Sequence, residues 1–449
     1  MLRSASLFRS FAGGAAKPHK LGDKSHFEVA VVAAGQFTNT ANMMMGTFCK
    51  HFPKTPVAFI GDRARPIMHE FSKDLYAHGA FKNESSMGKS IFQAPAKGFF
   101  YKLDSDVLEI KPAEKKLVLQ EKEYSYDVLI MAAEAQYDLD GVKNLEAALK
   151  DYWNSHVLCN AQMQISGNIP RVSREFRGGN MVFALPKSPY KNEGTSHVFM
   201  AVKELNNDKT IEGQWYGSKY ILTCADDYIH RVPFINDKMK SLAERYGVEV
   251  RYNLQLKEIL YNKSTDYHRL STLVYQNLKT GTTETINYGG LLYYPGSKIP
   301  KLVAPLVDQT GFIPVDKHTL QHATFKNVFA LGDCTNLPTI SNCLATASQA
   351  HTLAYNVDYF TKNMPLKAHY HGESATPIFT GMHQLILPGF DYSLNEISTK
   401  LTSDTSSFLA GIKQSLSFKL FKRYENKWFE KRLKGKIYGP PGWTKGAAH

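Results

Sequence analysis

The chain has 449 residues, of which 43% are hydrophobic and 12% aromatic, which excludes long disorder and leaves room for more than one buried core. No apolar run approaches the ~20 residues that a membrane-spanning helix needs, so we expect no transmembrane helix. The net charge of +13 favours a polyanionic partner, such as nucleic acid, anionic lipid or an acidic protein surface.

The first 25 residues have the composition of a targeting segment. The stretch "MLRSASLFRSFAGGAAKPHK" contains Arg3 and Arg9, several serines and two aromatic rings, and no acid precedes Asp23. This combination predicts a mitochondrial targeting segment over residues 1–25. A disordered basic tail is the alternative.

A βαβ unit follows. In "HFEVAVVAAGQFTNTA" a short apolar run leads into a turn with a single glycine, Gly35. The stretch "NTANMMMGTFCKHF" predicts a helix, "TPVAFIGD" a second strand, and the apolar run at 128–131 a buried strand. This is how a dinucleotide-binding fold begins, except that its phosphate loop is poor in glycine.

From about residue 150 the pattern starts again. The stretches "NMVFALP" and "SKYILTCA" predict strands, and "PFINDKMKSLAERYGVEVRYN" predicts a helix that runs into a strand. Further on, "NVFALGDCTN" predicts a late strand that ends at Gly332 and Asp333, and "SNCLATASQAHTLAYNVDYF" predicts a helix rich in small residues. The chain therefore contains two α/β units.

The last part of the chain is basic and amphipathic. Between Lys413 and Lys436 there are nine basic residues and two acids, and Leu416, Leu420 and Trp428 recur at helical spacing. Such a helix lies at a membrane interface or against a partner, and the basic excess favours an anionic lipid surface, contacted through 405–436. The alternative is an amphipathic helix packed on its own domain. No aromatic–basic strand pattern accompanies the charge, which argues against nucleic acid.

The five cysteines are scattered and include no CxxC pair. This spacing argues against a disulfide framework and against a structural zinc site, so we expect no metal and a reducing compartment.

Four segments resemble one family. They are "YDVLIMAAEAQYDLDGVKNL", "FALPKSPYKNEGTSHVFM", "GFIPVDKHTLQHATFKNVFALGDCTNLPT" and "YHGESATPIFTGMHQLILPGFDY". Their order and spacing are similar to those of mitochondrial sulfide:quinone oxidoreductases and the related flavocytochrome sulfide dehydrogenases. The resemblance covers almost the whole chain after the targeting segment.

The resemblance implies an α/β fold with two Rossmann-like dinucleotide-binding domains. An FAD-type domain would comprise 26–150 and 296–395, with an inserted NAD-type domain over 151–295. Residues 396–449 would form the amphipathic C-terminal region, which in the family enters one leaflet of the membrane.

In this family two cysteines take up sulfide sulfur, and FAD passes the electrons to a quinone. The sulfur carrier must be a thiolate, because neither an amide nor a hydroxyl can form a persulfide. The family motif P-x-x-P-x-K-C-x-G corresponds here to a stretch with Asn192 at the cysteine position, and Y-x-G-x-x-x-C-P to one with Thr376. No family cysteine position therefore retains a catalytic thiol.

The cofactor-binding motif has also lost several of its usual residues. The family's G-x-G-x-x-G corresponds to Ala33, Gly35 and Thr38, and the ribose-binding carboxylate position to Gly61, with Asp62 one residue further on. The first and third glycines normally allow a tight turn and close helix–strand packing. Glu134 adds a negative charge beside the expected pyrophosphate.

If a nucleotide is retained, its binding residues are predicted to be Gly35, Asp62, Gly332 and Asp333. In the family the Gly-Asp pair contacts the ribityl chain, and Ser341 stands where lysine is frequent. Alternatively, Asp333 is only a carboxylate at the N-terminus of the following helix. The expected cofactor is thus either none or FAD, and prolines in place of a second glycine-rich loop argue against NADH.

Three hypotheses follow. The first is a sulfide:quinone oxidoreductase-like pseudoenzyme that has lost sulfide oxidation and serves as an accessory subunit of a mitochondrial inner-membrane complex, respiratory complexes included. The second is an active FAD-dependent quinone oxidoreductase with an altered donor, peripheral to the inner membrane. The third is a binding module that uses its basic ends on a membrane surface or on nucleic acid, of which the membrane surface is favoured.

Overall fold

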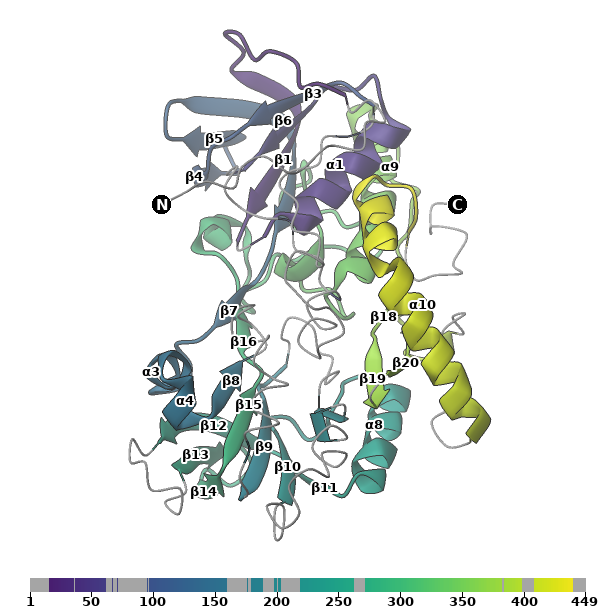
Figure 1. The fold of residues 1–449 in the computed structure, drawn as a ribbon. Helices are drawn as coiled ribbons and strands as arrows, with labels where there is room; N and C mark the ends of the chain where they lie inside the picture. Colours follow the sequence, from purple (N-terminus) through teal and green to yellow (C-terminus); the bar gives the residue numbers. More distant parts are fainter. Residues whose placement is uncertain are drawn as a thin grey trace, which may run out of the picture.

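The computed structural model describes residues 16–35, 37–61, 67, 71, 95, 97–159, 176, 179–188, 198–199, 201–202, 219–261, 271–381, 383–397 and 408–438. Most of the predicted targeting segment, residues 1–15, lies outside these ranges. Figure 1 shows two halves, each built on a sheet, that are joined by β7 and β16, with the long helix α10 along one side.

The upper half in Figure 1 contains a seven-stranded sheet in the order β3-β2-β1-β6-β5-β4. The seventh strand, β17, pairs with residues 129–131 of β6, beyond the part of β6 that pairs with β5. Its strands are β1 (His26–Ala34), β2 (Val57–Ile60), β3 (Phe100–Leu103), β4 (Val107–Lys111), β5 (Lys116–Leu119), β6 (Glu123–Ala133) and β17 (Val328–Ala330). The run β3-β2-β1-β6-β17 is parallel, and β4 and β5 join it as an antiparallel hairpin. The strand order reverses between β1 and β6, which is where doubly wound sheets bind their ligands.

Both faces of this sheet are covered, which explains why β1 and β6 are almost continuously apolar. One face packs against α1 (Asn39–His51) and α9 (Cys343–Thr361), and the other against η2 (Lys301–Leu306). The predicted helices 39–52 and 341–360 correspond to α1 and α9.

Helix α9 begins ten residues after Asp333, and Asn342 caps it by accepting hydrogen bonds from the backbone N–H groups of Leu344 and Ala345 at 3.0 Å. The alternative role for Asp333, as the carboxylate at the N-terminus of this helix, is therefore wrong. Asp333 lies instead in the short turn η3 (Gly332–Cys334).

The lower half contains a five-stranded parallel sheet in the order β11-β10-β9-β15-β8 and a three-stranded antiparallel sheet β12-β13-β14. Its strands are β8 (Val157–Cys159), β9 (Asn180–Leu185), β10 (Lys219–Cys224), β11 (Val248–Arg251), β12 (Leu254–Leu260), β13 (Ser271–Asn277), β14 (Thr283–Tyr288) and β15 (Gly290–Tyr293). Among its described helices are α3 (Leu145–Lys150), α4 (Tyr152–Ser155) and α8 (Pro233–Arg245). The prediction of two Rossmann-like units in an α/β fold is confirmed.

The strands β7 (Gln136–Asp138) and β16 (Gly296–Lys298) pair antiparallel and carry the chain between the halves. The segment before α10 forms β18 (Ser374–Ala375), β19 (Ile378–Gly381), β20 (Gln384–Ile386), β21 (Gly389–Phe390) and β22 (Glu396–Ile397). Helix α10 (Phe408–Leu433) then runs back to α1.

Helix α10 is docked closely on α1. A Cβ on Gly46 of α1 would lie 1.8 Å from the carbonyl oxygen of Leu433, so only glycine allows this approach. Phe418, Phe421 and Phe429 of α10 are buried in a hydrophobic cluster that also contains Met43 of α1. In the described part of the chain, no helix is both long enough and apolar enough to cross a membrane.

Candidate functional site

The candidate site lies at the carboxyl ends of β1, β6 and β17. Gly35 follows β1, Glu134 follows β6, and the Gly332–Asp333 pair follows β17 after one residue. Because parallel strands end at one edge of the sheet, these residues are brought together from positions far apart in the sequence. Two other predicted positions, Asp62 and Asn192, lie outside the described residues.

Gly35 is explained by packing of the chain on itself. Its φ is +97°, and a Cβ at this position would lie 2.1 Å from the backbone carbonyl oxygen of Glu134. The backbone N–H of Glu134 in turn donates to the carbonyl of Ala34 at 2.9 Å. The glycine thus permits the close approach of the β1 and β6 ends, which is a structural requirement whether or not a nucleotide binds.

Glu134 occupies the N-terminus of α1. Its side chain is 1% exposed, and its Oε1 accepts hydrogen bonds from the backbone N–H of Thr40 at 2.9 Å and from the Thr40 hydroxyl at 3.2 Å. A carboxylate is favoured there because the helix dipole and the first N–H groups, which have no partner within the helix, attract negative charge. In a dinucleotide-binding fold the same groups bind the pyrophosphate.

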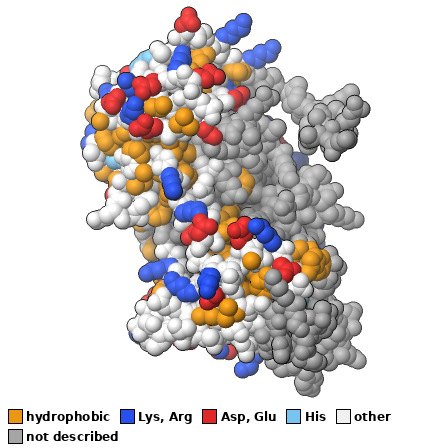
Figure 2. All heavy atoms as spheres, turned by 90° about the vertical axis from the view of Figure 1, so that its left-hand side faces the viewer, with side chains coloured by type: hydrophobic (Ala, Val, Ile, Leu, Met, Phe, Trp, Pro, Cys, Tyr) orange, Lys and Arg blue, Asp and Glu red, His pale blue; other side chains and the backbone are white. Residues whose placement is uncertain are grey.

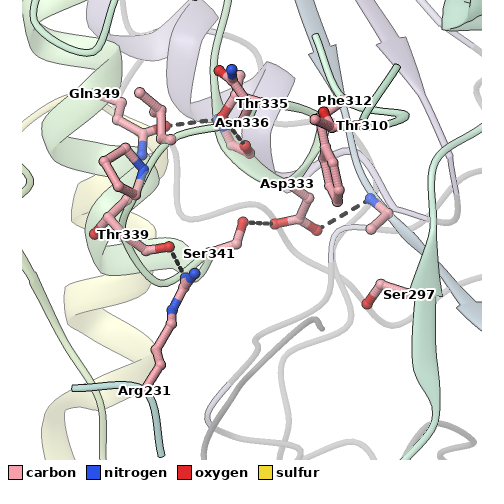
Figure 3. A pocket seen from close by; sticks show the side chains of 14 residues that line it. Arg231, Ser297, Thr310, Phe312, Asp333, Thr335, Asn336, Thr339, Ser341 and Gln349 are labelled. Carbon is pink, nitrogen blue, oxygen red and sulfur yellow. Dashed lines mark hydrogen bonds between the residues drawn. The ribbon is translucent and has the colours of Figure 1, made fainter. Parts of the chain in front are cut away.

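Asp333 is also held by its neighbours. It is 9% exposed, its Oδ2 accepts from the backbone N–H of Ala135 at 3.2 Å, and its Oδ1 accepts from the hydroxyl of Ser341. Figure 3 shows this carboxylate between Ser341 and the end of β6. The backbone N–H of Gly332 donates to the side chain of Gln349 on α9 at 2.7 Å.

Two spaces adjoin these carboxylates. The space at the start of α1, lined by Thr40, Glu134, Asp333 and Cys343 among others, measures about 10 Å³. This is about the room that a single water molecule requires. A larger cavity of about 430 Å³ lies beyond Asp333. It is lined by Ala135, Arg231, Ser297, Thr310, Phe312, Gly332, Asp333, Thr335, Asn336, Leu337, Pro338, Thr339, Ser341 and Gln349.

These observations test whether the residues fit FAD. A pyrophosphate is a large dianion, whereas the position it would take holds a carboxylate hydrogen-bonded to Thr40, a second carboxylate, and room for about one water. Burying like charges beside one another is strongly unfavourable. The described residues therefore do not fit the pyrophosphate of FAD.

The site also has no evident thiolate among the described residues. Thr376 follows β18 and is 3% exposed, with its N–H donating to the carbonyl of Pro388 at 3.2 Å. All five cysteines are buried. Burial raises the pKa of the Cys49 and Cys334 thiols to about 12, and it also raises the pKa of the Cys224 thiol. These three thiols are protonated at neutral pH and are poor nucleophiles.

Sequence reasoning singled out Glu134, Ser341 and Asp333 but missed Thr40 and Arg231. Arg231 precedes α8 in the lower half and reaches the cavity, where its guanidinium donates to the carbonyl of Thr339 (Figure 3). No local signal identifies such a residue, because its position depends on how the two halves pack.

No family model matches the chain. It is 28% identical to the mitochondrial sulfide:quinone oxidoreductase of Mus musculus over 380 residues, which is 84% of this chain and 80% of the mouse protein. It is also 28% identical to the mitochondrial sulfide:quinone oxidoreductase of Schizosaccharomyces pombe over 294 residues, covering 64% of this chain and 61% of the yeast protein.

Solved structures share the fold. A chain in the cryo-EM structure of the Tetrahymena thermophila mitochondrial ATP synthase superposes with a TM-score of 0.79 at 22% identity, covering 95% of this chain and all of that one. The sulfide:quinone oxidoreductase of Aquifex aeolicus superposes with a TM-score of 0.69 at 14% identity, covering 93% of this chain and all of that enzyme. The motifs, the fold and the curated relatives agree, and the chain is a divergent member of the sulfide:quinone oxidoreductase family.

Proposed function

We propose that this chain is a non-catalytic member of its family and serves as a structural, accessory subunit of a mitochondrial inner-membrane complex. The observation that carries the proposal is that a side chain of the protein itself occupies the place of the cofactor phosphate. Glu134 binds the N-terminus of α1 there, and the space left beside it measures about 10 Å³. A fold that fills its own cofactor site retains its shape and its surfaces, and these are what a scaffold uses.

The sulfur chemistry gives independent support. The family's two sulfur carriers correspond to Asn192 and Thr376, of which Thr376 is a buried hydroxyl. Because the described cysteines are buried as well, no thiol is offered in their place. The second hypothesis, an active flavoenzyme with another donor, requires FAD in a site that does not fit it.

The fold comparison suggests which assembly is involved. A chain of nearly the same fold and extent lies within a mitochondrial ATP synthase structure, and we propose an ATP synthase as the complex. The curated relatives are mitochondrial proteins, which supports the mitochondrial location predicted from residues 1–25. A peripheral position at the inner membrane is part of the proposal.

The exposed side of α10 supplies a surface for the membrane. Ile412, Leu416 and Leu420 are spaced four residues apart and are 47%, 54% and 45% exposed. The same side continues as Arg423 and Lys427, which are also exposed. An apolar row that continues into a basic one suits anionic lipid, with the leucines below the headgroups and the cations among them.

A second face of the molecule argues for lipid over nucleic acid. On the face shown in Figure 2, Lys and Arg side chains are interspersed with Asp and Glu, without one extended basic area among the described residues. Nucleic-acid binding relies on clustered basic charge along one face.

Purification from mitochondria of the native source tests the proposed role. A tagged chain should migrate on a native gel within a large complex, and mass spectrometry of that band should identify ATP synthase subunits. Migration as a free single chain, near the 50.5 kDa of the full sequence and outside any large complex, would contradict the proposal.

A vesicle assay tests the lipid surface. Leu416→Ser/Leu420→Ser should weaken binding to phosphatidylserine vesicles by about tenfold or more, because two inserted side chains are lost. Leu108→Ser is a matched control, since Leu108 on β4 is 59% exposed and lies far from α10 in the sequence. Equal binding by the wild type and the α10 variant would rule out this contact.

A further inference from the structure

The N-terminus of α1 has an unusual cap. Thr38 stands at the N-cap position, but its side chain makes no capping hydrogen bond. Its hydroxyl and carbonyl oxygens instead accept from the side-chain amide of Asn42, at 3.1 and 2.7 Å. The first turn of α1 contains no acidic residue. The helix therefore takes its capping anion from elsewhere in the chain.

That anion is the side chain of Glu134, 94 residues from its partner Thr40 in the sequence. Two backbone contacts hold its position. The N–H of Glu134 donates to Ala34 on β1, and Gly35 packs its Cα against the Glu134 carbonyl. The carboxylate is thus attached to the end of β6 and aimed at the start of α1, in a place that water scarcely reaches.

We propose that Glu134 is a built-in substitute for a phosphate: its carboxylate takes the position and the charge that a bound cofactor would supply, and it joins α1 to β6 without any ligand. This inference rests on the proposed loss of cofactor binding and explains how the fold tolerates that loss. In a cofactor-dependent fold, the positive end of α1 would remain uncompensated whenever the ligand left.

The Glu134 carboxylate also prevents a phosphate from binding at the same place. A phosphate would meet a negative charge at the helix N-terminus instead of free N–H groups, and it would have to displace a buried hydrogen-bonded side chain. Removal of the side chain beyond Cβ should therefore have two effects: the helix loses its cap, and a space for a small anion opens beside its free N–H groups, with Asp333 as the one carboxylate left in its lining.

Thermal unfolding of the full chain with and without inorganic phosphate tests the proposal. Glu134→Ala should lower the unfolding midpoint by about 2–8 °C, as expected for a lost cap in a domain of this size. Added phosphate, compared with chloride at equal ionic strength, should raise the midpoint of Glu134→Ala and leave the wild type unchanged. Glu134→Gln keeps the volume without the charge, so it should be destabilised but should not respond to phosphate.

Glu121→Ala is the control for loss of a carboxylate, because Glu121 is exposed and lies in the turn between β5 and β6, outside any helix. It should unfold like the wild type. If Glu134→Ala unfolds like the wild type, if phosphate does not raise its midpoint, or if phosphate raises the midpoint of all the variants equally, the substitute role is refuted. Those results leave the proposed function standing, whereas stoichiometric FAD bound to the wild-type protein would refute both.

Discussion

Arg432 and Glu425 form an ion pair inside α10, and its removal tests how the C-terminal region is attached. Their side chains are 0% and 2% exposed, and Arg432 Nη1 lies 2.8 Å from Glu425 Oε1. Burial raises the pKa of Glu425, and the neighbouring guanidinium partly offsets that rise. Replacing Arg432 with methionine keeps much of the volume but leaves a buried carboxylate without its counter-charge, which costs ~3–5 kcal/mol.

Cleavage of α10 by trypsin measures this cost locally. The exposed side of the helix carries several lysines, so trypsin cuts it when the helix detaches. Because cleavage of a rapidly reclosing segment follows its opening free energy, the ~3–5 kcal/mol cost means that Arg432→Met should be cut ~10²- to 10⁴-fold faster than wild type at pH 7. The double variant Glu425→Leu/Arg432→Met removes both charges and should be cut at a rate close to that of the wild type.

The pH dependence gives a second readout. The folded pKa of Glu425 lies above its ordinary value of 4.5, so its contribution to stability is complete below pH 4.5 and is lost as the pH rises through the folded pKa. Without Arg432 the folded pKa rises further. Lowering the pH from 7 to 5 should therefore slow cleavage of Arg432→Met relative to the wild type, with rates normalised to an unfolded peptide. A single variant cut no faster than wild type at pH 7 would refute this reasoning.

Three other perturbations test further parts of the structure. Gly46→Ala directs a Cβ at the Leu433 carbonyl, so the thermal midpoint should fall despite the ~1 kcal/mol gain in helix propensity; an unchanged midpoint would contradict this packing. Because the five cysteines are buried, Ellman's reagent should titrate no thiol in the native chain and all five in urea, and rapid reaction of native thiols would show that a reactive cysteine exists. Burial lowers the pKa of His230 to about 3, well below its unfolded value of 6.5, so stability should fall as the pH drops below 6.5, by ~2 kcal/mol at pH 5, in urea unfolding curves. His230→Phe should flatten that dependence, and an equal slope in both proteins would argue against it.

The elements that could be predicted from the sequence are those with strong local patterns. Strands β1 and β6 are buried on both faces and are therefore continuous apolar runs, and α9 is rich in small residues and almost wholly buried. The antiparallel sheet β12–β14 was not predicted, because its strands are only half-buried and their exposed polar residues interrupt the apolar runs.

The candidate site was predictable only in part. Glu134 was recognisable as a charge in the wrong place for a cofactor, yet its hydrogen bond to Thr40 depends on the register of β1 against β6. For Asp333 the sequence left open a ribityl contact and a place at the N-terminus of the following helix, and Asn342 supplies the cap of that helix. Contacts of this kind link distant segments, and no local pattern in a single sequence reports them.

The flavin content of the protein isolated from its native complex tests the central claim most directly. The protein should carry far less than one flavin per chain, measured by fluorescence after denaturation, and should reduce no quinone when sulfide is supplied. One FAD per chain together with quinone reduction would contradict the account, because the start of α1 would then have to bind a phosphate where the structure places Glu134.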